Sequence, residues 1–254
     1  ARKGLAAARR REGAAYAYGG DLRLRGWLER VRPVTLALLA ARRHFRTVGR
    51  ERVLASAVRV DERHLPAVAR AMDDAAALLA MPAPATYVVP DPGAVEIGVL
   101  GSEDEPLVLV PARLVDGLAD AELRAALGGA LGAVQNGHVE YLTALWALST
   151  ADDLVARWAG APARAALERW ALRAAVTTDR ASLIVTRDRA VAVASLVRRT
   201  LGRKRLLTEV DVAGFLGSLD ERGRSSSGDP EAQAARLGAR IVALSSIGHA
   251  RSDV

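Results

Sequence analysis

Three short β-rich runs interrupt a chain whose other apolar residues recur mostly at helical spacing. The runs are Thr86-Tyr-Val-Val, Val95-Glu-Ile-Gly-Val-Leu and Leu107-Val-Leu-Val, and Pro, Gly or Asp turn signals bound each of them. On either side, apolar residues repeat three and four positions apart, most clearly over residues 65–79 and 123–134. This order predicts a helix-dominated α+β fold with one small, mostly antiparallel sheet.

The first thirty residues differ from the rest because they are rich in Arg, Ala and Gly. They predict a solvated N-terminal arm, followed by a single domain over residues 31–250 with a flexible Ser- and Gly-containing loop at 221–230. Trp27 and Leu28 lie among arginines, which also leaves open a peripheral contact with an acidic membrane surface. No apolar run reaches the roughly 20 residues that a spanning helix needs, so we expect a cytoplasmic or peripheral membrane protein.

The composition excludes several classes of function. The chain has no Cys, which rules out disulfides, thiolate zinc sites and a Cys nucleophile, and its four His are His44, His64, His138 and His249. It carries a formal net charge of +7, but the arginines are dispersed and aromatic residues make up only 4%. We therefore expect no specific nucleic-acid binding. P-loop, G-x-S-x-G and G-x-G-x-x-G patterns are absent.

Four segments resemble the HtpX-like zinc metallopeptidases, the gluzincins of metallopeptidase family 48. They are Pro82-Ala-Pro-Ala-Thr-Tyr-Val-Val, the strand and helix start over residues 107–127, Val134-Gln-Asn-Gly-His-Val, and the stretch from Trp170 to Asp188. The resemblance implies a gluzincin-like domain with an active-site helix near residues 121–136, capped by Asp120 and packed beside a helix near residues 164–184. It also implies that this second helix brings the third metal ligand close to the first two.

The residues that carry the family's chemistry are missing. Where the family has H-E-x-x-H, this chain reads Gly128-Gly-Ala-Leu-Gly-Ala, which places Gly129 and Ala133 at the ligand positions and Ala130 at the general base. Ala175 stands at the third ligand. The resemblance then implies an inactive relative without a cofactor, kept as a protein-binding or scaffolding module. The alternative is an active peptidase whose unorthodox metal site uses His138, Glu140 or Asp179.

Glycines within a helix suggest where a partner could bind. Gly128, Gly129 and Gly132 each weaken a helix relative to Ala, so a row of them indicates close approach of another chain. Together with Leu107, Val108 and Leu109, expected to form an edge strand, they predict a groove for a protein partner or for a second copy of this chain. Close packing against a neighbouring helix of the same chain is the alternative.

Overall fold

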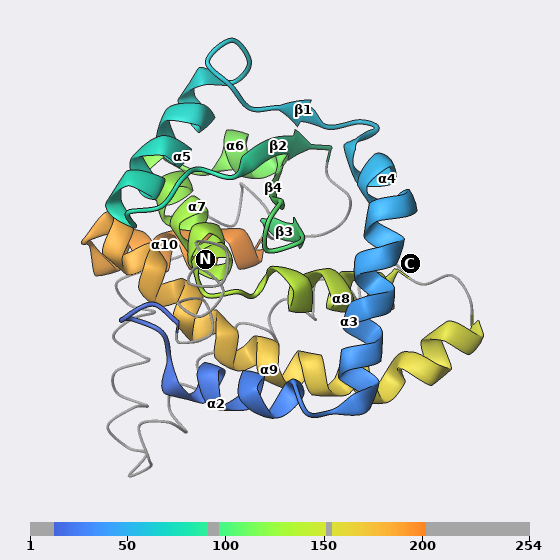
Figure 1. Cartoon of the computed structure of the whole chain (residues 1–254). Helices are drawn as coiled ribbons and strands as arrows, with labels where there is room; N and C mark the ends of the chain where they lie inside the picture. The colour runs from blue at the N-terminus through green and yellow to red at the C-terminus, as the bar shows by residue number, and fades with distance from the viewer. Residues whose placement is uncertain (1–12, 91–96, 151–153, 202–254) are drawn as a thin grey trace, which may run out of the picture.

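The computed structural model describes residues 13–90, 97–150 and 154–201, in which helices surround a small four-stranded sheet (Figure 1). The helix-dominated α+β fold predicted from the sequence is confirmed. The loop predicted at 221–230 and His249 lie outside the described residues.

The sheet is mixed, with the strand order β1-β2-β4-β3. Its strands are β1 (Val58–Arg59), β2 (Ala85–Val89), β3 (Gly98–Gly101) and β4 (Pro106–Pro111). The pairs β1–β2 and β3–β4 are antiparallel, whereas β2 and β4 run parallel, with Ala85 opposite Leu107. Consequently β4 lies inside the sheet, and its apolar run has no alternation because both of its faces are covered.

The N-terminal part of the chain packs into the fold instead of forming a solvated arm. Helix α2 (Gly19–Leu28) leads into α3 (Arg32–His44), a short π-helical stretch η1 (Phe45–Gly49) and α4 (Arg50–Leu54). Leu28 is completely buried beside Val34 and Trp170. The prediction of an arm over residues 1–30 is therefore wrong for residues 13–30, because its Leu and Tyr side chains find core partners on distant helices.

Helix α7 (Asp120–Gln135) occupies the centre of the main core. It packs against α5 (Pro66–Leu78), where Val68 and Met72 face it, and against β4, while the short α6 (Ala112–Gly117) connects β4 to it. The backbone N–H of Ala119 donates to Glu122 Oε2 (3.0 Å), so Glu122 caps the helix start and Asp120, predicted as the cap, is its first residue.

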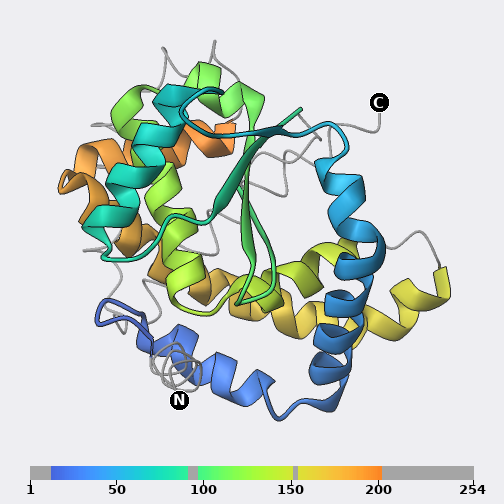
Figure 2. The same cartoon turned by 45° about the horizontal axis from the view of Figure 1, so that its top comes forward.

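A sharp turn after α7 sends the chain into α8 (Val139–Ser149). Gly137 has a φ of +70°, and the N–H of His138 donates to the carbonyl of Ala133 (3.0 Å), as in a Schellman motif. The long α9 (Leu154–Thr186) then passes α3, α2 and α7, and α10 (Arg189–Leu201) returns to α7 (Figures 1 and 2). In the part of the chain that the structure describes, no helix has the length and apolarity to cross a membrane.

Candidate functional site

The helices expected to carry the metal centre are neighbours. α7 and α9 pack along each other, as the sequence predicts. The two helices are antiparallel, because Gly128 contacts Val185 whereas the later Gly132 contacts the earlier Ala181. Gly129, Ala130 and Ala133 are buried on α7, and Ala175 is half-buried on α9. The contacts of Gly129 are with Thr178 and Ser182, the turns of α9 that follow Ala175.

The three glycines of α7 sit where α9 comes closest. A Cβ atom built on Gly128 would lie 2.9 Å from Val185 Cγ2, and one on Gly132 would lie 2.4 Å from Ala181 Cβ. Such distances are shorter than van der Waals contact, so even Ala does not fit without moving a helix. We call the contact of these glycines with α9 the α7–α9 seam.

The groove predicted from these glycines is therefore filled by the chain itself. Gly128, Gly129 and Gly132 are buried against α9, which agrees with the alternative of internal helix packing. Leu107, Val108 and Leu109 are buried as well, and the prediction that they form an edge strand is wrong because β3 and β2 flank β4 on both sides. The unbroken apolar run of these residues indicated a buried strand, but we had assigned it to the edge of the sheet.

The residues present at the expected centre do not fit a zinc ion. Gly129, Ala133 and Ala175 have no donor atom, and a Cβ atom on Gly129 would already lie 2.9 Å from Ser182 Oγ. Ser182 donates its hydroxyl to the carbonyl of Thr178 (3.2 Å). Among the described residues, no three His, Asp or Glu side chains gather as a group that could hold a metal ion.

A buried polar cluster lies beyond the C-terminal end of α7. Asp21 of α2 accepts hydrogen bonds at Oδ2 from His138 Nε2 (2.8 Å) and Thr177 Oγ1 (2.7 Å), and at Oδ1 from Trp170 Nε1 (2.8 Å). Each of these four residues is at most 1% exposed, and the ring of His138 meets that of Trp170 edge-on. The cluster ties α2, the start of α8 and α9 together.

The electrostatics of the cluster depend on Asp21. Burial by itself would raise the pKa of Asp21, but the hydrogen bonds and charge of His138, with those of Thr177 and Trp170, lower it below its ordinary value. His138 Nδ1 is buried and has no hydrogen-bond partner in the structure. With Nε2 as the donor to an ionised carboxylate, His138 holds α8 against α2 without contact with solvent.

The sequence did not indicate this cluster. It offered His138 as a candidate ligand of an unorthodox metal site, whereas the ring binds Asp21, 117 positions earlier in the chain. One signal was available, because Asp21 is the only acidic residue between Glu12 and Glu29. His44 and His64 are exposed.

The segment before α2 closes one end of the α7–α9 seam. Tyr16 donates its hydroxyl to Gln135 Oε1 (2.6 Å), and Asn136 Nδ2 donates to the Tyr16 hydroxyl (3.2 Å). On the α9 side, Arg180 donates to the carbonyl of Tyr16 (3.1 Å). Burial raises the pKa of Tyr16 to about 12, so this hydroxyl remains a donor at neutral pH.

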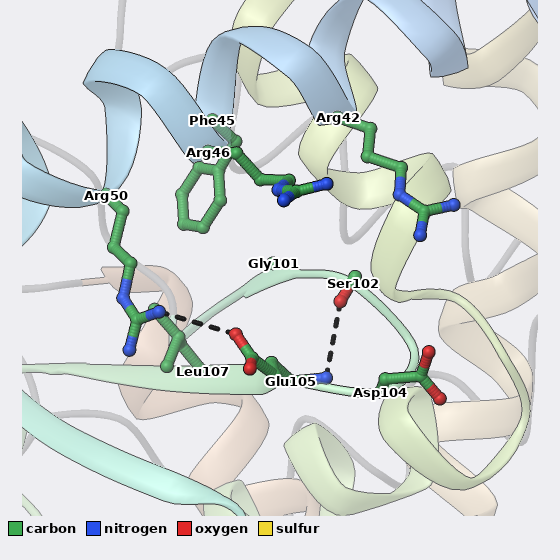
Figure 3. A pocket seen from close by; sticks show the side chains of 9 residues that line it. All are labelled: Arg42, Phe45, Arg46, Arg50, Gly101, Ser102, Asp104, Glu105 and Leu107. Carbon is green, nitrogen blue, oxygen red and sulfur yellow. Dashed lines mark hydrogen bonds and ion pairs between the residues drawn. The ribbon is translucent and has the colours of Figure 1, made fainter.

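Among the described residues, two of the cavities that open to solvent border the β3–β4 hairpin. The smaller, of about 360 Å³, lies between the helix turns that carry Arg42, Arg46 and Arg50 and the β3–β4 hairpin (Figure 3). Arg50 pairs there with Glu105 (3.4 Å), so the cavity has walls of opposite charge. The larger, of about 1000 Å³, lies between the loop over residues 80–85, the same hairpin and the end of α7. Of the residues predicted to form the partner groove, only Leu107 lines these cavities, and it lines both of them.

Comparison with known proteins supports a metallopeptidase-like chain. The chain is similar to a protein of Arabidopsis thaliana named plastoglobule-localized metallopeptidase 48, chloroplastic, with 31% identity over 159 residues. The match covers 61% of this chain and 46% of that protein, so the chain spans less than half the length of the relative. No protein-family profile and no solved structure matches the chain.

A first prediction concerns the glycines of the seam. Gly132→Ala places a methyl group against Ala181, and we expect it to lower the free energy of unfolding by roughly 1–3 kcal/mol. Gly26→Ala in α2 meets nothing within 4 Å and serves as the matched control. It should raise the free energy of unfolding by roughly 0.5–1 kcal/mol, measured by urea denaturation. Equal effects of the two substitutions would contradict the close packing at Gly132.

A second prediction concerns Asp21. Because its pKa is lowered in the folded state, its contribution to stability is present above its unfolded pKa, near 4, and is lost as the pH falls through the folded pKa. Asp21→Asn should lower the free energy of unfolding by roughly 2–4 kcal/mol at neutral pH. The difference between the two proteins should shrink as the pH falls below about 4. Exposed Asp73→Asn is the control, and a pH-independent difference for Asp21→Asn would contradict this account.

Proposed function

We propose that this metallopeptidase-like chain does not hydrolyse peptides and instead acts by binding another protein. The close contact of Gly129 with Ser182 carries the proposal, because a Cβ atom at position 129 would already lie 2.9 Å from Ser182 Oγ, which leaves little room for a ligand imidazole. The general-base position is Ala130, whose methyl group cannot move a proton. The absence of metal-binding side chains and the close packing of α7 against α9 are two independent arguments that this chain does not hydrolyse peptides.

An unorthodox active site would have to use side chains that already have partners. His138 is buried and engaged with Asp21. Glu140, two residues later, pairs with Arg42 (3.6 Å). Asp179 on α9 also interacts with another group. Recruiting His138 and Glu140 to one metal ion would break both pairs, so the alternative of an active peptidase has less support.

The larger cavity is the best place for a protein partner. Its apolar wall is formed by residues of the loop 80–85, by Leu107 and by Val134 at the end of α7. Glu103, Asp104 and Glu105 of the β3–β4 hairpin lie along the same cavity. Apolar walls beside a row of carboxylates suit a partner segment that combines apolar with basic residues.

The first experiment tests for catalysis. Protein purified from its native cell without chelators should contain less than stoichiometric zinc, measured by elemental mass spectrometry, and should not cleave an unfolded protein substrate. A known zinc peptidase purified in parallel controls for loss of metal. One tightly held zinc per chain, together with cleavage that a chelator abolishes and zinc restores, would establish the active alternative.

The second experiment tests the binding surface. A photo-crosslinking amino acid at Ala83, exposed beside the larger cavity, should form an adduct with one protein in the native cell. The same amino acid at Ala67, exposed on α5, is the matched control and should not. The identified protein, once purified, should bind the wild-type chain and bind an Ala83→Arg variant at least tenfold more weakly. An adduct between two copies of this chain, or equal adducts from both positions, would contradict the proposal.

A further inference from the structure

One stretch of the sequence has a large net excess of positive charge. Residues 19–50 contain eight Arg and two acidic residues, a formal excess of six positive charges out of the seven of the whole chain. Asp21 is buried, so Glu29 is the one exposed acidic side chain in this stretch, all of which the structure describes. The surface of α2 and α3 is therefore basic, whereas residues 51–254 carry a formal net charge of −3.

Helix α3 also presents apolar side chains to solvent. Its inner face packs on α8 and α9 through Val34 and Ala41, which are at most 4% exposed. On the other face, Leu36 is 57% and Leu39 is 67% exposed. Both belong to the stripe Arg32, Leu36, Leu39 and Arg43, whose members follow one another at intervals of three or four residues. The two leucines thus lie between two exposed arginines.

The end of α2 adds a second apolar anchor. Trp27 is 52% exposed on the last turn of α2, and the exposed Arg30 follows it just before α3 begins. A short loop connects the end of α2 to the start of α3, and α3 crosses α8 and α9 (Figures 1 and 2). Leu28, predicted together with Trp27 to face a membrane, is instead fully buried.

We propose that this surface, made of Trp27, Arg30, Arg32, Leu36, Leu39 and Arg43, binds the surface of a membrane that contains anionic lipids. An interfacial helix carries an apolar stripe that enters the headgroup region, with Arg or Lys beside it to contact lipid phosphates. Trp prefers that same interface. Arg42 and Arg50, by contrast, turn toward the protein, where they pair with Glu140 and Glu105.

Other occupants fit the surface less well. Nucleic acid would use the arginines, but two exposed leucines gain nothing from a phosphate backbone. A second copy of the chain would bring basic surfaces together with only Glu29 to offset them. A lipid surface uses both the apolar and the basic residues. The proposal does not depend on whether the chain has peptidase activity.

Vesicle co-sedimentation tests the proposal with the full chain. We expect binding to vesicles of phosphatidylcholine mixed with phosphatidylserine and no binding to phosphatidylcholine alone. Arg32→Gln with Arg43→Gln should weaken binding about fivefold per arginine removed. Leu36→Ser with Leu39→Ser should weaken it roughly tenfold, and because both leucines are exposed the variant should keep its circular dichroism spectrum.

Two matched double variants control for the loss of charge and of apolar surface elsewhere. Arg63→Gln with Arg70→Gln removes two exposed arginines, and Leu183→Ser with Ile184→Ser removes two exposed apolar residues of α9. Both should bind mixed vesicles like the wild type. Equal binding to neutral vesicles, or equal losses in the control variants, would overturn the proposal. So would a wild-type dimer that the Leu36 and Leu39 substitutions dissociate, or RNA binding that outcompetes the vesicles.

Discussion

The close approach of α7 to α9 is the contact on which the rest of this structure depends. α7 is the central helix of the main core, with α5 and β4 on its other sides, so its position fixes theirs. Gly128, Gly129 and Gly132 let α9 come to distances at which a methyl group would collide. Each glycine weakens the helix by up to about 1 kcal/mol relative to Ala. The dispersion contacts and apolar burial gained along the seam offset that cost.

The buried Asp21 cluster joins the N-terminal region to this arrangement. Three donors from two other segments converge on one carboxylate, which satisfies a charge that would otherwise be costly to bury. α2 is thereby fixed against α9, and α3 begins only four residues after α2 ends. The exposed basic and apolar face of α3 is thus presented by a rigid base, while its inner face is committed to the core.

Local patterns predicted the elements, and distant contacts decided their partners. Helical spacing found α5 and α7, and β-rich runs between turn signals found β2 and β4. The strand order could not be read from the sequence, because an unalternating run such as Leu107 to Val110 indicates burial on both faces but not which strands flank it. The burial of Leu28 was missed for the same reason. An amphipathic pattern predicts which face of a helix is apolar, but only the fold shows which element packs against that face. The pair of Asp21 and His138 joins residues 117 positions apart, beyond the range of any local pattern.

On the proposal that this metallopeptidase-like chain holds no metal ligands, the seam explains how its frame persists. Replacing two imidazoles and a carboxylate by hydrogen atoms or methyl groups would leave a cavity if the helices stayed in place, and its cost grows with the volume left empty. Closing α7 onto α9 removes that volume, and Gly rather than Ala is needed at the points of closest approach. We expect Gly129→His alone to destabilise the fold, because the new Cβ atom would already lie 2.9 Å from Ser182 Oγ. On this proposal, the packing between α7 and α9 opposes the return of a metal site, whereas the cavity beside β4 and the surface of α3 lie outside this constraint.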